Sequence, residues 1–450
     1  MTMKKYTFYL VVILFFCSCK KMDNWLDVKS KNSDVILSSV ADYQSLLDNT
    51  AVMNTTPGIN IVASDNIQLI ENTALTAGLP AERNAYIWKE DIYEGAIGVG
   101  TGDWTVPYRA IAYANIALEG MDKLTQTSAE SDNVRGSALF YRGFHYYQLL
   151  QLYAPPYKEG ANQPCVLPLR DVSDVGVPGK LSTVEDCYNK VIVDLNTALE
   201  LLPLVPASMT RPSRLAALAM LAKVYLVMEK YDKAGEYVDR YLENQSELLD
   251  FSTLNTAATL PFPALDVGNK EVTFYAGPIS YSLLSFGNLR VNESVYSSYQ
   301  DNDLRKTAFF RTNADGTKSF KGRYTGTVGL FSGLATNEMV LMKAECLART
   351  GKWEEGAGLL NTLCQKRYKN YAEPVDGSPE NTLQRILQER NKELVFTGTC
   401  RWEDLRRLNK DPRFAKTLTR TLAGKAYALS SNDPRYTFPV IPQEWTTLTK

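Results

Sequence analysis

Apolar positions recur at helical spacing over several long stretches of the chain, as they do on the buried face of an amphipathic helix. This spacing predicts helices within 24–49 and over 107–124, 133–153 and 183–203. Pro107 suits a first helical turn, because the amide hydrogen that proline lacks has no partner there. Pro155-Pro156 stops the third helix, and Ser182-Thr183 opens the fourth as a cap.

Two further predicted helical hairpins share one pattern. The first runs from Arg214 to Leu242 around a turn at Glu229-Lys230-Tyr231. Its small residues let two antiparallel helices approach closely, which resembles the tetratricopeptide repeat. Such repeats bury their faces against neighbours, so we expect a curved helical scaffold. At a constant offset of 122 residues, Ala222, Tyr225, Lys230-Tyr231 and Ala234 match Ala344, Leu347, Lys352-Trp353 and Gly356.

Residues 50–104 and 250–336 lose the helical period and combine aromatic side chains with many Gly, Asn, Ser or Thr. Within the second stretch, Glu271–Tyr275 alternates like a short strand. Long loops on a rigid scaffold often carry binding residues, although each ring taken alone is more often core. The predicted fold class is all-α, a tetratricopeptide-like scaffold of helical hairpins with long aromatic-rich loops and a few short strands.

Charge is concentrated in Arg385–Leu408, which mixes acidic and basic residues with apolar ones at helical spacing. Glu389 and Glu393 are four residues apart, so on a helix their carboxylates face the same way and repel. A cation between them would relieve that repulsion, and Arg385 and Arg401 are candidates. Such a cluster is compatible with an active site or with a structural ion network.

The first residues have the organisation of a bacterial export signal. Lys4 and Lys5 precede the apolar run Phe8–Phe16, which is too short to span a bilayer but suits a signal peptide. A small residue, Ser18, stands before Cys19, as in a lipobox. We therefore expect residues 1–18 to be a lipoprotein signal peptide and Cys19 to carry the lipid. An ordinary secretory peptide with incidental cysteines is the alternative.

Composition narrows the function further. The chain has 450 residues, 45% of them hydrophobic, and a net charge of −1, so it lacks the basic excess of a nucleic-acid-binding protein. The five remaining cysteines are widely spaced and suggest neither a disulfide framework nor a metal site. His145 is the single histidine, which excludes zinc motifs that need two, and no phosphate-binding loop occurs. We expect no cofactor and no metal.

Ordered motifs along nearly the whole chain resemble the SusD/RagB family of Bacteroidetes outer-membrane lipoproteins. The pattern at 389–407 is the most specific, but Thr397 stands where the family often has an acid, and Arg401 lies one residue later than usual. The motifs are Cys19 with Trp25-Leu26-Asp27, Trp104…Tyr108…Ile111…Asn115, Arg142…Tyr146-Tyr147…Leu152-Tyr153, Val191…Asp194-Leu195…Ala198…Leu202-Pro203, Arg214–Tyr225, Glu389-Arg390…Glu393-Leu394…Phe396…Arg401-Trp402…Asp404-Leu405-Arg406-Arg407 and Pro439-Val440-Ile441-Pro442.

The resemblance implies a surface-exposed outer-membrane lipoprotein that captures a nutrient, most often an oligosaccharide, and passes it to a SusC-like TonB-dependent transporter. It implies one SusD-like domain over 19–450, with repeat-like helices at about 107–245 and 337–408 and ligand loops at about 50–104 and 250–336. In this sequence those loops offer Asp65, Asn66, Trp88, Tyr93, Tyr275, Tyr281, Phe286 and Tyr324 as candidate ligand-binding residues.

The charged stretch then becomes a scaffold element rather than an active site, because the chain offers it no catalytic partner. We predict a helix, a turn at Thr397-Gly398, and a return of Arg401, Asp404 and Arg406 to the Glu389/Glu393 pair. The predicted structural ion network comprises Arg385, Glu389, Glu393, Arg401, Asp404 and Arg406.

The expected function is therefore non-catalytic binding. A peptide-binding RagB-like subunit or a scaffolding repeat protein at the same membrane is the alternative. A glycoside hydrolase is the hardest enzyme to exclude, because it needs only two carboxylates.

Overall fold

The computed structural model describes residues 37–69, 78–96, 102–124, 127–265 and 267–449. Cys19 and the predicted signal peptide lie outside these residues. The longer helices are α3 (Val40–Leu47), α8 (Gly102–Leu124), α9 (Ala129–Tyr153), α10 (Val184–Leu201), α11 (Arg214–Val227), α12 (Tyr231–Leu242), α15 (Thr336–Arg349), α16 (Trp353–Cys364), α17 (Pro379–Glu393), α18 (Cys400–Leu408) and α19 (Pro442–Thr449). Shorter helical segments are α4 (Thr50–Met53), α5 (Ile59–Ala63), α7 (Pro80–Tyr86), α13 (Glu293–Tyr296), α14 (Arg305–Phe309) and the 3-10 turns η1 (Phe251–Thr253), η2 (Ser282–Leu284) and η3 (Pro434–Tyr436).

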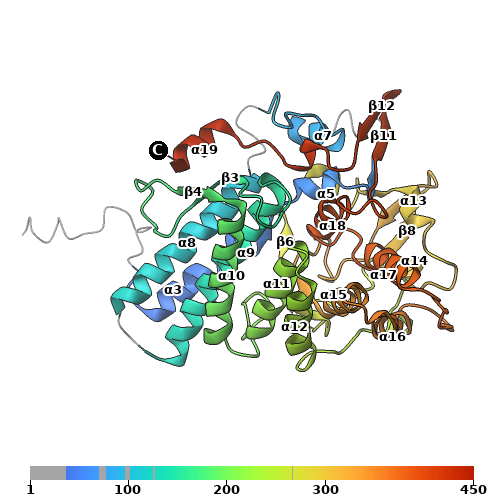
Figure 1. Cartoon of the computed structure of the whole chain (residues 1–450), viewed down its shortest axis with the longest axis horizontal. Coiled ribbons are helices and arrows are strands. Elements are labelled where there is room, and N and C mark those ends of the chain that lie inside the picture. The colour runs from blue at the N-terminus through green and yellow to red at the C-terminus, as the bar shows by residue number, and fades with distance from the viewer. Residues whose placement is uncertain (1–36, 70–77, 97–101, 125–126, 266, 450) are drawn as a thin grey trace, which may run out of the picture.

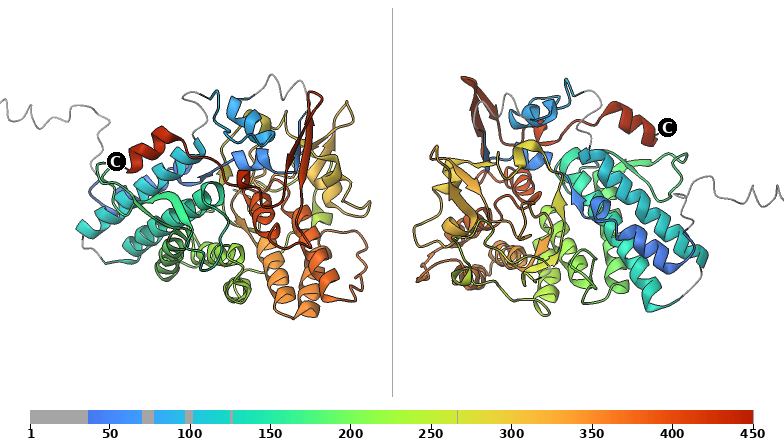
Figure 2. Two further views of the ribbon diagram at one scale, coloured as in Figure 1. Left: turned by 45° about the horizontal axis from the view of Figure 1, so that its top comes forward. Right: turned by 180° about the vertical axis from the view of Figure 1, so that it is seen from behind.

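Successive long helices pack side by side along the chain. The series α8, α9, α10, α11, α12, α15 and α16 forms consecutive neighbours, and α17 packs against α15 and α16. Figure 1 shows α3, α8, α9 and α10 at one end of the molecule, α15–α18 at the other, and α11 and α12 between them. The two views of Figure 2 show the same order. The predicted all-α fold class is confirmed.

The two predicted hairpins are α11–α12 and α15–α16. Their turns correspond in backbone conformation, since Glu229 and Gly351 both adopt positive φ, 60° and 88°. A side-chain carbon added to Gly356 would lie 2.7 Å from the Ala344 carbonyl oxygen, so the second hairpin does cross at its small residues. The second helix pair therefore has the close approach that the sequence pattern predicted, and Ala222 and Ala234 of the first pair are fully buried.

Local signals set most helix boundaries, with two corrections. Thr183 caps α10 by accepting a hydrogen bond from the Asp186 amide, as predicted. Helix α8 begins at Gly102 rather than near Pro107, which lies inside it. Residues 50–104 are not only loops, because α4, α5 and α7 form there. These helices are too short for their periodicity to be recognised in the sequence.

The strands form small two-stranded sheets, and two of these sheets join the predicted loop regions. Strand β1 (Thr55–Thr56) pairs in parallel with β6 (Gly277–Pro278), and β2 (Ile67–Gln68) pairs antiparallel with β7 (Arg290–Val291). The stretches 50–104 and 250–336 are therefore adjacent in space. The other antiparallel pairs are β3 (Pro164–Leu169) with β4 (Lys180–Thr183), β5 (Val272–Phe274) with β10 (Leu334–Ala335), β8 (Phe310–Thr312) with β9 (Lys318–Phe320), and β11 (Leu418–Leu422) with β12 (Lys425–Leu429).

Candidate functional site

A cavity of ≈ 430 Å³ opens where the two loop regions meet. Every residue lining it belongs to 50–55 or 275–330, so it lies entirely within the stretches predicted to hold the ligand site. Its wall combines apolar, aromatic and hydrogen-bonding side chains. The lining residues are Thr50, Ala51, Asn54, Thr55, Tyr275, Gly277, Pro278, Ile279, Ser280, Leu284, Ser285, Phe286, Arg323, Val328, Gly329 and Leu330. We call this space the loop cavity.

Backbone hydrogen bonds hold the loop cavity open in a fixed shape. The Gly277 amide donates to the Asn54 carbonyl (2.9 Å), and the Ile279 amide donates to the Thr56 carbonyl (2.8 Å). On the far wall the Thr325 hydroxyl donates to the Gly329 carbonyl (3.0 Å). The cavity is therefore formed before any ligand arrives, which lowers the ordering cost of binding.

Asn54 lines this cavity, and its side-chain oxygen has no partner among the described residues. Its Nδ2 donates to the backbone carbonyls of Thr210 (2.8 Å) and Tyr275 (2.7 Å), which fixes the orientation of the amide. The unpaired oxygen, Oδ1, is buried. Tyr275 is half-buried, and no described residue bonds to its hydroxyl. The Tyr275 hydroxyl is therefore open to a polar ligand, and the unpaired Asn54 oxygen lies in the same wall.

Arg323 adds a buried positive charge to the same wall. The side chain is 2% exposed, and its guanidinium carbon lies 5.2 Å from the centre of the Phe286 ring. The Arg311 guanidinium carbon lies 4.7 Å from the same centre. Burial, followed by the positive charge of Arg311, lowers the pKa of Arg323 to about 10. Arg323 therefore remains charged at neutral pH.

Of the eight candidate residues, the structure brings only Tyr275 and Phe286 into the loop cavity. Several others have structural partners. Trp88 is 3% exposed and donates from Nε1 to the Ala63 carbonyl (2.8 Å), and the buried Tyr281 hydroxyl donates to Asp103. Tyr324 donates to the Glu271 carboxylate (2.8 Å). Asp65 is held by Arg401, Tyr93 bonds to Tyr153, and Asn66 is buried.

Among the cavity residues that the sequence did not single out, Asn54 and Arg323 have polar side-chain atoms without a partner in the described part of the chain. The prediction weighted aromatic residues, whereas these two matter because their polar atoms lack partners. That property depends on tertiary contacts, so no local pattern in the sequence indicates it.

Glu389 and Glu393 do belong to a buried ion network, but none of the partners predicted for them contacts either glutamate. Arg305 pairs with Glu389 (2.5 Å) and with Glu393 (3.1 Å), and Arg367 pairs with Glu393 (2.8 Å) and Glu271 (2.7 Å). Both arginines are fully buried. Both arginines come from outside Arg385–Leu408, one from the insertion and one from the segment after α16, while Lys392 of the stretch itself pairs with Glu389 (2.5 Å).

The predicted partners bind elsewhere. Arg385 pairs with Asp376 (2.7 Å), and Arg401 pairs with Asp65 (2.6 Å). Asp404 pairs with Arg390 (2.9 Å) and Arg407 (2.9 Å). Arg406 donates to backbone carbonyls of residues 150, 151 and 154 at the end of α9. The charged stretch thus contacts several other elements, and within it Asp404 joins α18 to α17 through Arg390.

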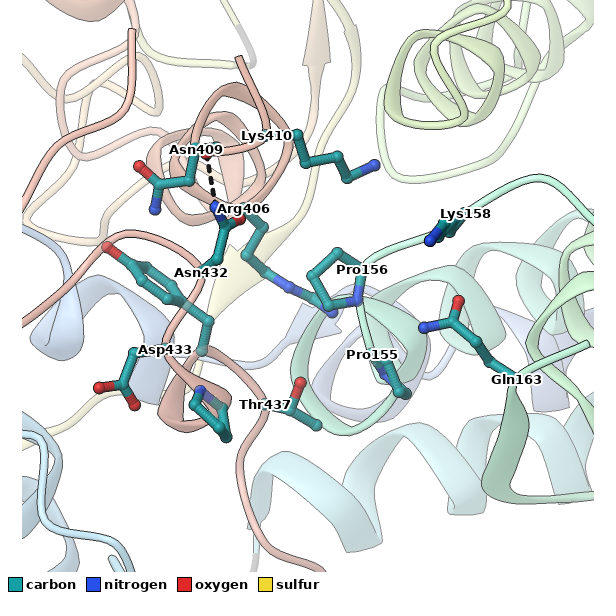
Figure 3. Close-up of a pocket in the computed structure, with 12 residues that line it drawn as sticks. Pro155, Pro156, Lys158, Gln163, Arg406, Asn409, Lys410, Asn432, Asp433 and Thr437 are labelled. Carbon is teal, nitrogen blue, oxygen red and sulfur yellow. Dashed lines mark hydrogen bonds between the residues drawn. The ribbon is translucent and has the colours of Figure 1, made fainter. Parts of the chain in front are cut away.

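Arg406 also lines a second cavity, of ≈ 660 Å³, between the end of α9 and residues 432–437. In Figure 3 its side chain extends towards Pro155 and Pro156, while Lys158 and Lys410 lie at the edge. The Arg406 guanidinium is committed to the α9 carbonyls, and no predicted ligand loop contributes to this cavity. We therefore regard the loop cavity as the stronger candidate site.

Glu338, Cys400 and Glu403 lie close enough together to hold a metal ion. The ammonium of Lys223 fills the space between them, at 2.9 Å from Glu338, 3.1 Å from Glu403 and 3.2 Å from the Cys400 sulfur. Within the described residues this group is therefore an ion-pair centre. Among the same residues, no helix has the length and apolar character to cross a membrane.

Comparisons with known proteins show which families this chain resembles. A family model described as "Starch-binding associating with outer membrane" matches residues 24–226, and the SusD family model matches residues 336–445. "SusD-like protein P2" of Formosa agariphila is 25% identical over 298 residues, which cover 62% of this chain. The match spans 55% of that relative's own length.

Solved structures share the fold. A putative sugar binding protein from Bacteroides vulgatus gives a TM-score of 0.74 at 19% identity, covering 92% of this chain and 98% of the other. A SusD superfamily protein from Bacteroides thetaiotaomicron gives 0.72 at 20% identity, covering 91% and 98%. The fold and the cavity define a helical-repeat protein with a preformed cleft on its inserted loops. The chain belongs to the SusD/RagB family.

Proposed function

We propose that this protein captures an oligosaccharide at the outer membrane and delivers it, unaltered, to a partner TonB-dependent transporter. The loop cavity is the observation that carries this proposal. It offers apolar and aromatic surface from Tyr275, Phe286 and Leu330, which suits the C–H faces of sugar rings. The unpaired Asn54 Oδ1 and the half-buried Tyr275 hydroxyl add polar atoms for sugar hydroxyls.

The family matches support the same function. One matched family is described as starch-binding and associating with the outer membrane, and a structural neighbour is described as a putative sugar binding protein. A lipid on Cys19 would hold the protein at that membrane. The transporter follows from the family resemblance.

Binding without catalysis is favoured by the chemistry of the cavity. The residues that line it include no Asp, Glu, His or Cys, so within the described part of the chain it has no acid or base for hydrolysis. The carboxylate-rich centre around Glu393 is instead buried and neutralised by arginines. We therefore assign the loop cavity to recognition alone.

The test is a binding screen of the purified chain from Lys20 onward against a broad panel of neutral and acidic oligosaccharides. Isothermal titration calorimetry measures affinity, and mass spectrometry of the recovered sugar detects cleavage. Retention of at least one sugar, recovered intact, supports the proposal. Absence of binding to the whole panel, or co-purification of peptides, contradicts it. Affinity purification of the lipidated protein from its native membrane should recover the transporter.

A further inference from the structure

Arg323 of the loop cavity and two basic side chains close to it in the chain, Arg311 and Lys321, have no acidic counterpart. Arg311 lies in β8, while Lys321 and Arg323 follow β9 directly, so one hairpin presents all three. Lys321 is 6% exposed and Arg323 2%. The Lys321 ammonium donates to the carbonyls of Thr256 (2.5 Å) and Ala258 (3.2 Å). No carboxylate of the described residues forms an ion pair with any of the three.

Other buried arginines of this protein differ in having partners. Arg305 and Arg367 each contact two or more carboxylates. Arg406 and Arg420 lack a carboxylate but donate to several backbone carbonyls. In Arg323, Nε and Nη2 are buried and have no hydrogen-bond partner in the described part of the chain. The centre of the Phe286 ring lies 5.2 Å from its guanidinium carbon.

A buried guanidinium without an anion is costly, and buried charges in proteins are normally paired. The positive charge of Arg311 repels Arg323 and Lys321. Burial is the larger cause of the lowered pKa of both side chains, and this repulsion is the second. An anionic ligand would remove both penalties at once. A guanidinium also matches carboxylate and sulfate oxygens with two parallel hydrogen bonds.

Building on the proposed function, we propose that the captured oligosaccharide is acidic, and that Arg323, assisted by Arg311, binds its carboxylate or sulfate group. The Asn54 Oδ1 then accepts a hydrogen bond from a hydroxyl of the same ligand, and Tyr275 borders it. One cavity thereby supplies donors for an anion together with an acceptor for a hydroxyl, which is the combination that an acidic sugar requires.

The position of the cluster explains why the family matches do not indicate this preference. The two matched stretches, 24–226 and 336–445, lie on either side of 227–335. Arg311, Lys321 and Arg323 all fall in that intervening segment. The scaffold is thus common to the family, while the charge specificity belongs to the insertion of this chain.

The test compares each acidic oligosaccharide with its own neutral counterpart. Oligogalacturonate is paired with its methyl ester, and a sulfated galactan oligosaccharide with its desulfated form, which separates the carboxylate from the sulfate. Calorimetry in 50 mM and 500 mM NaCl adds the salt dependence. We expect one acidic member to bind at least tenfold more tightly than its neutral partner, and more weakly in high salt.

Arg323→Gln should abolish that tenfold difference, and Arg311→Gln should reduce it. Arg109→Gln, which removes an exposed arginine of α8, is the matched control and should leave it unchanged. Thermal melting of each variant checks that it is folded. If Arg323→Gln is unstable, the affinity difference measured with Arg311→Gln decides the question. Equal affinity for neutral and charged partners overturns this inference but leaves the proposed function standing. Binding of no sugar at all, or Arg323-dependent binding of a tetraglutamate peptide instead, overturns both.

Discussion

Arg401 and Asp65 form a two-point ion pair across 336 residues of sequence, with Nε–Oδ1 at 2.6 Å and Nη2–Oδ2 at 2.8 Å. Arg401 lies in the first turn of α18, and Asp65 follows α5 in the first loop region. The pair thus ties the charged C-terminal stretch to the loops near the proposed site. Lys416 adds a contact to Asp65 at 2.9 Å.

Asp65→Asn should destabilise the protein and leave sugar affinity unchanged. The substitution strands the largely buried Arg401, and loss of one partner of a buried pair costs about 3–5 kcal/mol. Urea unfolding followed by circular dichroism measures the loss. Asp301→Asn is the control, because Asp301 is fully exposed and its removal should not move the midpoint. If the Asp65→Asn protein is stable but no longer binds sugar, Asp65 is a ligand-binding residue, as the sequence predicted.

Glu393→Ala should be at least as harmful, since Glu393 contacts both Arg305 and Arg367 in a fully buried centre. The expected decrease in unfolding free energy is about 3–5 kcal/mol, with lower expression and unchanged intrinsic affinity. Glu200→Ala, an exposed helical glutamate, is the matched control. Normal stability of the Glu393 variant would show that the network is not a brace.

Acid should unfold the protein through its paired glutamates. Burial alone would raise the pKa of Glu338, Glu345 and Glu389, but their Lys and Arg neighbours outweigh it and hold each at about 2. Their ordinary value is 4.5, so this stability is fully present above about pH 4.5 and is lost as pH falls towards 2. Burial raises the pKa of Glu271, so this carboxyl does not contribute to the loss of stability in acid.

The slope of unfolding free energy against pH tests this directly. Near pH 3.5, these three glutamates together should bind about two to three protons when the protein unfolds. Glu389→Gln should remove about one of them. A slope near zero between pH 3 and pH 4 would contradict the low pKa values.

The sequence could predict what depends on short-range pattern. The α11–α12 and α15–α16 hairpins follow from helical period and from small residues such as Ala344 and Gly356. The partners of Glu393 could not be predicted, because Arg305 is 88 residues away and Arg367 is 26 away. The two predicted loop regions are adjacent in space, yet within them the side chains of Trp88 and Tyr281 are buried. Burial of a single ring depends on tertiary packing, which alternating or helical patterns do not encode.

Trp88 provides a test of that inward assignment. Its indole donates to the Ala63 carbonyl and stacks 4.4 Å from the Arg420 guanidinium carbon. Trp88→Phe should therefore remove one hydrogen bond to the buried Ala63 carbonyl. The expected decrease in unfolding free energy is about 1–3 kcal/mol. Sugar affinity should remain that of the unaltered protein in calorimetry. A binding loss at unchanged stability would contradict the core assignment.

Tyr275 should behave in the opposite way. Its hydroxyl has no partner in the described part of the chain, so Tyr275→Phe removes no internal hydrogen bond and should leave the melting temperature unchanged. The tightest-binding oligosaccharide of the panel should lose about 3–10-fold in affinity, the value of one hydrogen bond. Tyr113→Phe, a half-buried tyrosine of α8 outside the cavity, is the matched control. Because the two variants make the same chemical change, equal affinity in both would show that the ligand does not reach Tyr275.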